Sequence, residues 1–431
     1  MAKANLYTNP NKILNLLASP SRVETPFIKI TIGKYTFGVY DKVSSNGFDA
    51  SGVYTINKIK YPNYVQRLTV EKINGVVNKY TLYLTYAVTE ADDPNFFYKV
   101  FSSVSKTRKI VFSYGDLSAP TFIYKDEEAL ILSVKQRLQT SSSKITYVVK
   151  AVSVGKTLSM GAFSFATPNW TGKHKASALI KRLVFDPKYG LQDVFYGMSD
   201  KSRVELEGLI PETDVHVEVE AKVNISPIDY LLYLVSIMKP SKSSGMIKNG
   251  VYTLVCVDDV SGKFKGPYFK IILVEKKKDM PLAFDLDVGY PSQNIVTDLE
   301  IEDDEGYTIF YNFYEELNTD QYVQRINDRG ELEEVYAPLL GSDNSYRKAT
   351  EEEKTWWTTI TEFPIKAKIT MKGLLRPAIL MSHIRLNIYF YGRRHLGSGL
   401  YIVTKQIDDI SESGFRTTLG LLRVGQADGL E

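Results

Sequence analysis

Residues 64–88 read YVQRLTVEKINGVVNKYTLYLTYAV. Polar and apolar side chains alternate on both sides of Asn74-Gly75. This dipeptide between two alternating runs is a strong β-hairpin signal, because both residues tolerate positive φ. Both runs are also rich in aromatic and β-branched residues, which fit the pleated surface of a sheet. The stretch therefore predicts two antiparallel strands joined by a tight turn.

Further strand patterns surround this hairpin. Residues 27–32 and 35–40 alternate across Gly33-Lys34, and later runs cover 109–114, 121–124 and 145–154. Strands at this spacing, with no long helical pattern between them, indicate a barrel or a sandwich. We predict an N-terminal arm over 1–23 and a first antiparallel β unit, a barrel or a sandwich, over 24–157.

The pattern changes between residues 158 and 282, where we predict a smaller mixed α/β region. Apolar residues at helical spacing predict an amphipathic helix over 173–185. A second helix is predicted over 226–239, with Ser226 as N-cap, Pro227 at the first helical position and Pro240 as the stop. Strands are expected again at 252–257 and 268–274.

The last part of the chain, 283–431, is predicted to be a second antiparallel β unit. Its expected strands are 308–314, 367–371, 384–391, 400–407 and 415–424, with a polar loop over 408–414. Residues 327–362 are charged and poorly periodic, so we interpret them as an excursion that includes Trp356-Trp357. The fold class is thus mainly β (α+β), with two antiparallel β units, a mixed α/β region between them and a few short helices.

Composition limits the possible functions. The 53 Lys and Arg nearly balance the 50 Asp and Glu, so the cation surplus expected for nucleic-acid binding is missing. No apolar run approaches the roughly 20 residues of a membrane-spanning helix, and the N-terminus lacks a signal-peptide pattern. The single Cys256 lies in an apolar run and is expected to be a buried, unreactive thiol. The 29 Tyr residues favour strands and protein interfaces.

An acidic segment is the main candidate for metal binding. Between residues 279 and 324 there are twelve Asp or Glu residues and no Lys or Arg. Clustered carboxylates suit Ca²⁺, but residues 298–306 do not have the loop spacing that places Gly at the sixth position. We therefore interpret the segment as a solvated face and predict no metal site.

No set of residues with catalytic spacing is found. His174, His216, His383 and His395 are scattered, and one cysteine gives no zinc motif. Ser103-Val104-Ser105-Lys106 and Ser342-Asp343-Asn344 match two elements of the penicillin-binding set, but the third element, Lys-Thr-Gly, is absent. Adjacent acids such as Glu333-Glu334 and 351–353 do not provide two carboxylates across a cleft. We predict no catalytic, cofactor-binding or metal-binding residues, and no enzyme.

The C-terminal strands carry a family resemblance. The order AKITMKG (367–373), Pro377, SGLYIVTKQ (398–406) and FRTTLGLLR (415–423) resembles the last barrel strands of phage baseplate hub proteins. Upstream, NISPIDYLL (224–232) is similar to the mid-chain helix of that family. FDLDVGYP (284–291), with Asn294 and Val296, is similar to its Gly-Tyr-Pro turn. The N-terminal strands fit in character only.

The resemblance implies a mechanical role in a phage tail. Hub proteins of this family form a trimeric ring between the six-fold tail tube and the three-fold spike, and each chain contributes two tail-tube-like barrels. The resemblance therefore implies that residues 24–157 and 283–431 are two antiparallel tail-tube-like β-barrels. The expected partners are two further copies of the chain, the tail tube ring, the central spike and other baseplate proteins. The expected location is the virion tail baseplate, after synthesis and assembly in the host cytoplasm.

Two other interpretations remain open from the sequence. The chain could be the hub-like portion of another tail-tip or secretion-spike component. It could also be a cell-wall hydrolase whose carboxylate site the sequence does not reveal. Activity on cell-wall material would distinguish the hydrolase from both structural interpretations.

Overall fold

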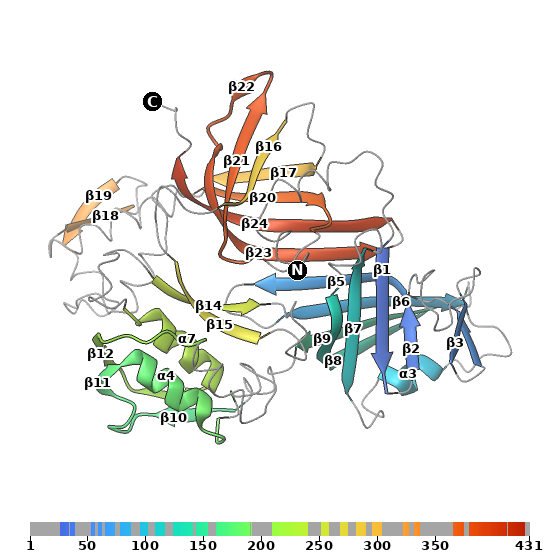
Figure 1. Ribbon diagram of the computed structural model, residues 1–431, viewed down its shortest axis with the longest axis horizontal. Coiled ribbons are helices and arrows are strands. Elements are labelled where there is room, and N and C mark those ends of the chain that lie inside the picture. The colour runs from blue at the N-terminus through green and yellow to red at the C-terminus, as the bar shows by residue number, and fades with distance from the viewer. Residues whose placement is uncertain are drawn as a thin grey trace, which may run out of the picture.

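The computed structural model describes a set of segments of the chain. These are residues 26–33, 35–38, 53–56, 59–62, 65–73, 78–87, 95–101, 108–116, 124–139, 141, 144–153, 161–189, 191, 209–239, 251–257, 268–274, 282–289, 295–303, 322–326, 332–336, 365–374, 379–411 and 413–426. They are mainly β-strands with a few short helices, as the sequence predicts (Figure 1).

The elements divide into three groups along the chain. The first comprises β1 (Pro26–Ile32), β2 (Tyr35–Gly38), β3 (Val53–Ile56), β4 (Ile59–Pro62), β5 (Val65–Ile73), β6 (Lys79–Ala87), α3 (Phe96–Phe101), β7 (Lys109–Asp116), β8 (Tyr124–Gln139) and β9 (Lys144–Ser153). The second comprises β10 (Phe163–Phe165), β11 (Gly172–Lys175), α4 (Ala176–Phe185), β12 (His216–Val219), β13 (Lys222–Ile225), α7 (Pro227–Ser236), β14 (Val251–Val257) and β15 (Tyr268–Val274). The third comprises β16 (Leu282–Val288), β17 (Val296–Asp303), β18 (Tyr322–Ile326), β19 (Leu332–Tyr336), β20 (Ile365–Lys372), β21 (His383–Phe390), β22 (Arg393–Arg394), β23 (Gly399–Ser411) and β24 (Gly414–Gln426).

One large sheet joins the first and third groups. Its strand order is β17-β20-β24-β23-β5-β6-β9-β8-β7-β1-β2, and β21, β16 and β22 branch from β23. The path is open at β17 and β2, so the two closed barrels predicted from the sequence are not confirmed within the described residues. The all-antiparallel prediction for 283–431 is wrong at one edge, because β16 pairs with β21 in parallel.

The predicted hairpins are largely correct. β5 pairs with β6, and β1 pairs with β2, both antiparallel as their alternation predicts. The turn residues Asn74-Gly75 lie outside the described residues. Leu68, Val70, Leu82 and Leu84 are fully buried, so the alternating apolar positions of this hairpin face the core. Phe415, Leu419 and Leu421 of β24 are buried in the same cluster.

The loop predicted over 408–414 is wrong, and the strand found there joins the first group to the third. β23 continues through Asp408, Asp409 and Ile410 to Ser411, and β24 starts at Gly414. Asp is depleted in strands, which is why these residues appear to be a loop from the sequence. Here their backbone pairs with β5, and their carboxylates bind cations from that strand, so tertiary contacts override the local preference.

The middle group has its own cluster of buried side chains around α4 and α7. Phe165 and Tyr230 stack with ring centroids 3.9 Å apart, and Trp170 meets both rings edge-on. Ser226 caps α7 as predicted, because its hydroxyl accepts a hydrogen bond from the Asp229 N–H, and Pro227 follows. The helix predicted over 173–185 begins later, at Ala176, because residues 172–175 pair with β12.

Other differences concern elements with mixed or charged sequences. Of the expected strand 121–124, only Tyr124 lies in the described part, as the first residue of β8, a 16-residue strand that contains many charged residues. Residues 284–288 of the stretch that resembles the family's turn belong to β16, and Tyr290 and Pro291 lie outside the described residues. The expected strand 308–314, Ser103, residues 342–344 and 351–353, and Trp356-Trp357 lie outside the described residues. Cys256 lies on β14, but its side chain is outside the described part.

Candidate functional site: the seam and an exposed hairpin

The first and third groups meet along one pair of strands, which we call the seam. It is the antiparallel pairing of β23 residues 405–411 with β5 residues 67–73. Over its first four residues, β23 instead pairs with β21, and a register irregularity between Val403 and Lys405 separates the two stretches. Along one edge, β23 thus pairs first with β21 and then with β5, and along its other edge it pairs with β24. The seam is therefore continuous with the sheet on both sides (Figure 1).

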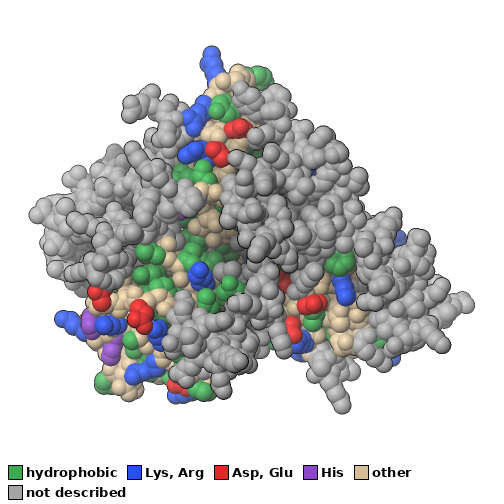
Figure 2. Space-filling model, in the orientation of Figure 1, with side chains coloured by type: hydrophobic (Ala, Val, Ile, Leu, Met, Phe, Trp, Pro, Cys, Tyr) green, Lys and Arg blue, Asp and Glu red, His purple; other side chains and the backbone are tan. Residues whose placement is uncertain are grey.

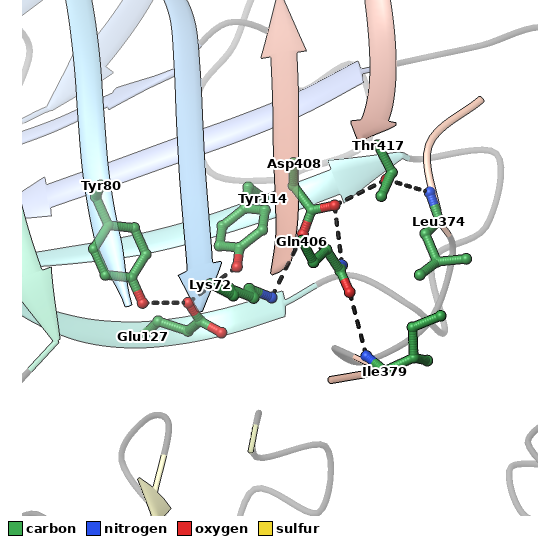
Figure 3. A network of polar contacts seen from close by, with 9 residues as sticks. All are labelled: Lys72, Tyr80, Tyr114, Glu127, Leu374, Ile379, Gln406, Asp408 and Thr417. Carbon is green, nitrogen blue, oxygen red and sulfur yellow. Dashed lines mark hydrogen bonds and ion pairs between the residues drawn. The ribbon is translucent and has the colours of Figure 1, made fainter. Parts of the chain in front are cut away.

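The inner face of the seam contains a buried ion pair. Lys72 Nζ lies 3.5 Å from Asp408 Oδ2, and both side chains have 0% exposure. Gln406 Nε2 donates to both oxygens of Asp408, at 3.1 and 3.0 Å, and Thr417 Oγ1 donates to Oδ1 at 2.8 Å (Figure 3). A charge taken out of water is costly unless it is paired and hydrogen-bonded, and Asp408 satisfies both conditions.

Loop backbone groups extend this network. The Leu374 N–H donates to Thr417 Oγ1 at 2.7 Å, and the Ile379 N–H donates to Gln406 Oε1 at 3.2 Å. Both donors belong to the connection between β20 and β21, so the network also fixes that connection against the seam (Figure 3).

A second buried carboxylate lies on the other side of the network. Glu127 Oε2 accepts hydrogen bonds from the Tyr80 hydroxyl at 2.7 Å and from the Tyr114 hydroxyl at 3.1 Å. Lys72 Nζ lies 4.2 Å from the ring centroid of Tyr124, which stacks on Tyr114. Lys72 and Glu127 therefore both contact Tyr114, at its ring and its hydroxyl respectively.

The outer face of the seam is also joined by charges. Arg67 binds Asp409 with two hydrogen bonds of 2.6 Å, in the fork geometry that guanidinium and carboxylate groups prefer. Lys405 Nζ lies 2.6 Å from Glu71, and Lys79 lies 3.7 Å from the same carboxylate. The hydrogen bond to Asp409 raises the pKa of Arg67, and the hydrogen bond from Lys405 lowers the pKa of Glu71. Alternate residues of one strand pair thus form ion pairs on both faces of the sheet.

Burial lowers the pKa of His383 below its ordinary value, because the charged imidazolium is poorly solvated there. At pH values between the two pKa values, His383 therefore binds a proton in the unfolded chain but not in the folded chain. Stability contributed by His383 is full above pH about 6.5 and is lost as the pH falls through the lower folded-state pKa. We expect His383→Gln to flatten the pH dependence of the urea midpoint as the pH falls below about 6.5. An unchanged slope in that variant would contradict the assignment; Glu71 titrates only at lower pH.

The second feature is an exposed hairpin tip, residues 389–396, formed by the end of β21, β22 and their turns. Tyr391 is 104% exposed, and the neighbouring Phe390 and Leu396 are more than half exposed. Arg393, the first residue of β22, is also exposed. Figure 2 shows basic and hydrophobic side chains gathered at the tip where Figure 1 places β21 and β22. A cluster of exposed aromatic, aliphatic and Arg side chains is the composition of an interaction surface.

The base of the hairpin tip is held firmly. Gly289, at the end of β16, has φ +82°, and a Cβ there would lie 2.1 Å from the Tyr389 carbonyl oxygen. Asn387 Nδ2 donates to Asp285 and Asp287 of β16, each at 2.9 Å. The hairpin tip therefore projects from a base that these contacts hold in place.

The residues singled out in the sequence are dispersed. His216 is exposed on β12, and His174 contacts the carbonyls of Pro168 and Thr171. His395 Nδ1 accepts from the Gly397 N–H in the hairpin tip. Asp298, Glu300 and Glu302 of the acidic segment are exposed on β17. Within the described ranges, no three His, Cys, Asp or Glu side chains are grouped to hold a metal ion.

The seam and the hairpin tip were not identified from the sequence. Lys72 and Asp408 are far apart along the chain, and no local pattern connects them. The run FYGRRHL, residues 390–396, combines aromatics with two Arg after an alternating strand and could have marked the hairpin tip. In the described part of the chain, no helix is long and apolar enough to cross a membrane.

Comparison with known proteins gives structural matches only. No family model and no curated protein matches the chain. A 43 kDa tail protein of prophage MuSo2 from Shewanella oneidensis is similar over 94% of this chain and 100% of its own, with a TM-score of 0.48 and 10% identity. A tail protein from Neisseria meningitidis matches over 94% and 98%, with a TM-score of 0.45 and 8% identity.

A third match is an E. coli type VI secretion component described as structurally similar to T4 phage tail proteins. It covers 87% of this chain and 79% of its own, with a TM-score of 0.44 and 9% identity. At these identities and scores, no functional residue is transferred from any of the three. Two of these solved structures are described as tail proteins, and the third is described as a component of a type VI secretion system.

Proposed function

We propose that this chain is the structural baseplate hub of a phage tail and forms a trimeric ring that joins the six-fold tail tube to the three-fold central spike. In this proposal the first and third groups of strands are the two tail-tube-like units, so three chains present six units to the tube. The partners are two further copies, the tube ring, the spike and other baseplate proteins, in the virion tail.

The seam is the observation that carries this proposal. A chain that matches six-fold to three-fold symmetry must hold two units in a fixed relative orientation, because each unit faces a different part of the same ring. Here seven consecutive register pairs unite the two groups in one sheet, with ion pairs on both faces. The sequence motifs of the last strands support the same family, and one of them, SGLYIVTKQ (398–406), ends within the seam on β23.

The alternative role is the hub-like portion of another tail-tip or secretion-spike component. The seam supports this alternative equally well. The two roles differ in the proteins that the ring contacts. Averaged electron micrographs of the purified chain test the main proposal directly. A closed ring of three copies with six similar lobes is expected. A two-fold particle or an open filament would contradict it.

The hairpin tip is proposed to contribute to the contact between copies. Its exposed Phe390 and Tyr391 are of the residue types that dominate binding at interface centres, where truncating one aromatic anchor costs about 2 kcal/mol, or roughly thirty-fold in the dissociation constant. We expect the double variant Phe390→Ser, Tyr391→Ser to shift light-scattering mass from trimer towards monomer, with an unchanged circular dichroism spectrum. Val223→Ser, at a similarly exposed apolar residue on β13, is the matched control and should remain trimeric. A trimeric double variant would remove the hairpin tip from the interface.

A further inference from the structure

The buried network on the inner face of the seam has the composition of a self-modifying site. We propose that Lys72 and Asp408 condense spontaneously to an intramolecular amide bond, with Glu127 as the proton carrier. This cross-link would join β5 to β23 and so lock the two groups of strands together covalently. The bond would form within a single folded chain, whatever that chain assembles with.

The first requirement is proximity. The Lys72 nitrogen and the Asp408 carboxylate lie on neighbouring strands with Nζ 3.5 Å from Oδ2, and neither side chain is exposed. Groups held within about 3–3.5 Å react as one molecule, at effective concentrations of about 10⁵ M or more. The backbone pairing on both sides of the pair prevents separation, because Gln406 lies opposite Lys72 and Asp408 lies opposite Val70.

The second requirement is a dry, low-dielectric site. Tyr80 stacks on Phe112 at 4.7 Å, and Tyr114 stacks on Tyr124 at 4.6 Å, and all four rings are buried. Such surroundings disfavour separated charges. Transfer of a proton from the Lys72 ammonium to the Asp408 carboxylate then gives the neutral amine and the neutral acid that can react. The same surroundings also exclude the water that would hydrolyse the product.

The third requirement is stabilisation of the charge that develops during attack. Gln406 Nε2 donates to both oxygens of Asp408, but Thr417 Oγ1 donates to Oδ1 alone, at 2.8 Å, whereas Oδ2 is the oxygen 3.5 Å from Lys72 Nζ. Donors fixed in this way stabilise the oxyanion of a tetrahedral intermediate. Oδ1 is therefore the oxygen that carries the negative charge, and Oδ2 is the one that leaves.

The step balances without another reactant. The Lys72 nitrogen forms a bond to Cγ of Asp408, and the bond from Cγ to Oδ2 breaks. Glu127 accepts a proton from the attacking amine and passes it to Oδ2, which departs as water; Glu127 ends in its initial state. Glu127 is buried, is oriented by two tyrosine hydroxyls and shares Tyr114 with Lys72 (Figure 3). No oxidant, metal or cofactor takes part.

Mass spectrometry of the denatured full chain tests the proposal. The wild-type mass should be lower than the sequence mass by one water. A trypsin digest should contain peptide 68–79 joined to peptide 406–416, because a modified Lys72 is no longer cleaved. The Lys72→Met chain should show the full sequence mass. The full mass in the wild-type chain, after prolonged incubation under folding conditions, would overturn the proposal.

Two further variants identify the mechanism. Asp408→Asn should lose ammonia in place of water and reach the same cross-linked product as the wild-type chain. Glu127→Gln should retain the wild-type β-sheet circular dichroism but cross-link at least tenfold more slowly, because the proton carrier is missing. Loss of water that maps to another site, or that persists in Lys72→Met, would refute the assignment even where the wild-type mass is reduced.

Discussion

Replacing Lys72 with methionine is expected to lower the free energy of unfolding by about 3–5 kcal/mol, because the change leaves a buried carboxylate without its cation. Methionine has nearly the same length as lysine, so little of this loss comes from a cavity. Asp408 retains its bonds from Gln406 and Thr417, but it has 0% exposure and no route to water. Urea unfolding followed by circular dichroism measures the change. The loss will be greater where the proposed amide has formed.

Two controls separate the buried charge from a general effect of losing a lysine. Lys368→Met removes an exposed partner of Glu300 and should leave stability unchanged, because exposed pairs contribute little. The double variant Lys72→Met, Asp408→Leu should recover part of the loss, because it removes both charges together. A Lys72→Met chain as stable as the wild-type chain would contradict the role given to the buried pair.

Replacing Leu419 with aspartate is expected to cost about 4 kcal/mol or more and to abolish assembly, because it places an unpaired charge in the core. Leu419 has 0% exposure and lies on β24 opposite Ile369 on one side and Gln406 on the other. The change thus affects both the core and the strand next to the seam. Loss of the cooperative thermal transition, or its shift to a much lower temperature, is the expected result.

Thr418→Asp is the matched control on the same strand. Thr418 faces the opposite side of the sheet, where its hydroxyl lies 3.1 Å from that of Thr370 and its side chain is only half-buried. Alternate residues of a strand point to opposite faces, so the same charge one position earlier retains access to water. Equal destabilisation by the two substitutions would contradict the placement of Leu419 in the core.

Local patterns predicted the elements whose signals are contained within a few residues. The alternating runs of β5 and β6 and the Ser226-Pro227 start of α7 are examples, because turn chemistry and capping act over three or four residues. β8 was mostly missed, because its 16 residues include many charges that strand preferences disfavour. The parallel pairing of β16 with β21 also has no local signal, since the two strands are about one hundred residues apart.

The candidate site could not be predicted for the same reason. Asp408 and Asp409 resemble a solvated loop until Lys72 and Arg67 are placed beside them by pairing across the chain. A single sequence shows where acids and bases occur but not which of them meet. The motifs of the last strands carry a family resemblance, but they do not indicate which side chains of the seam meet.

Light scattering after size exclusion tests the trimeric hub most directly. If the chain forms the trimeric ring, we expect a mass of three times the 48.8 kDa of the chain over a range of concentrations. The Phe390→Ser, Tyr391→Ser variant, measured alongside, should shift towards the monomer. A wild-type chain that remains a monomer at every concentration, or that forms a dimer, would contradict a ring built by this chain.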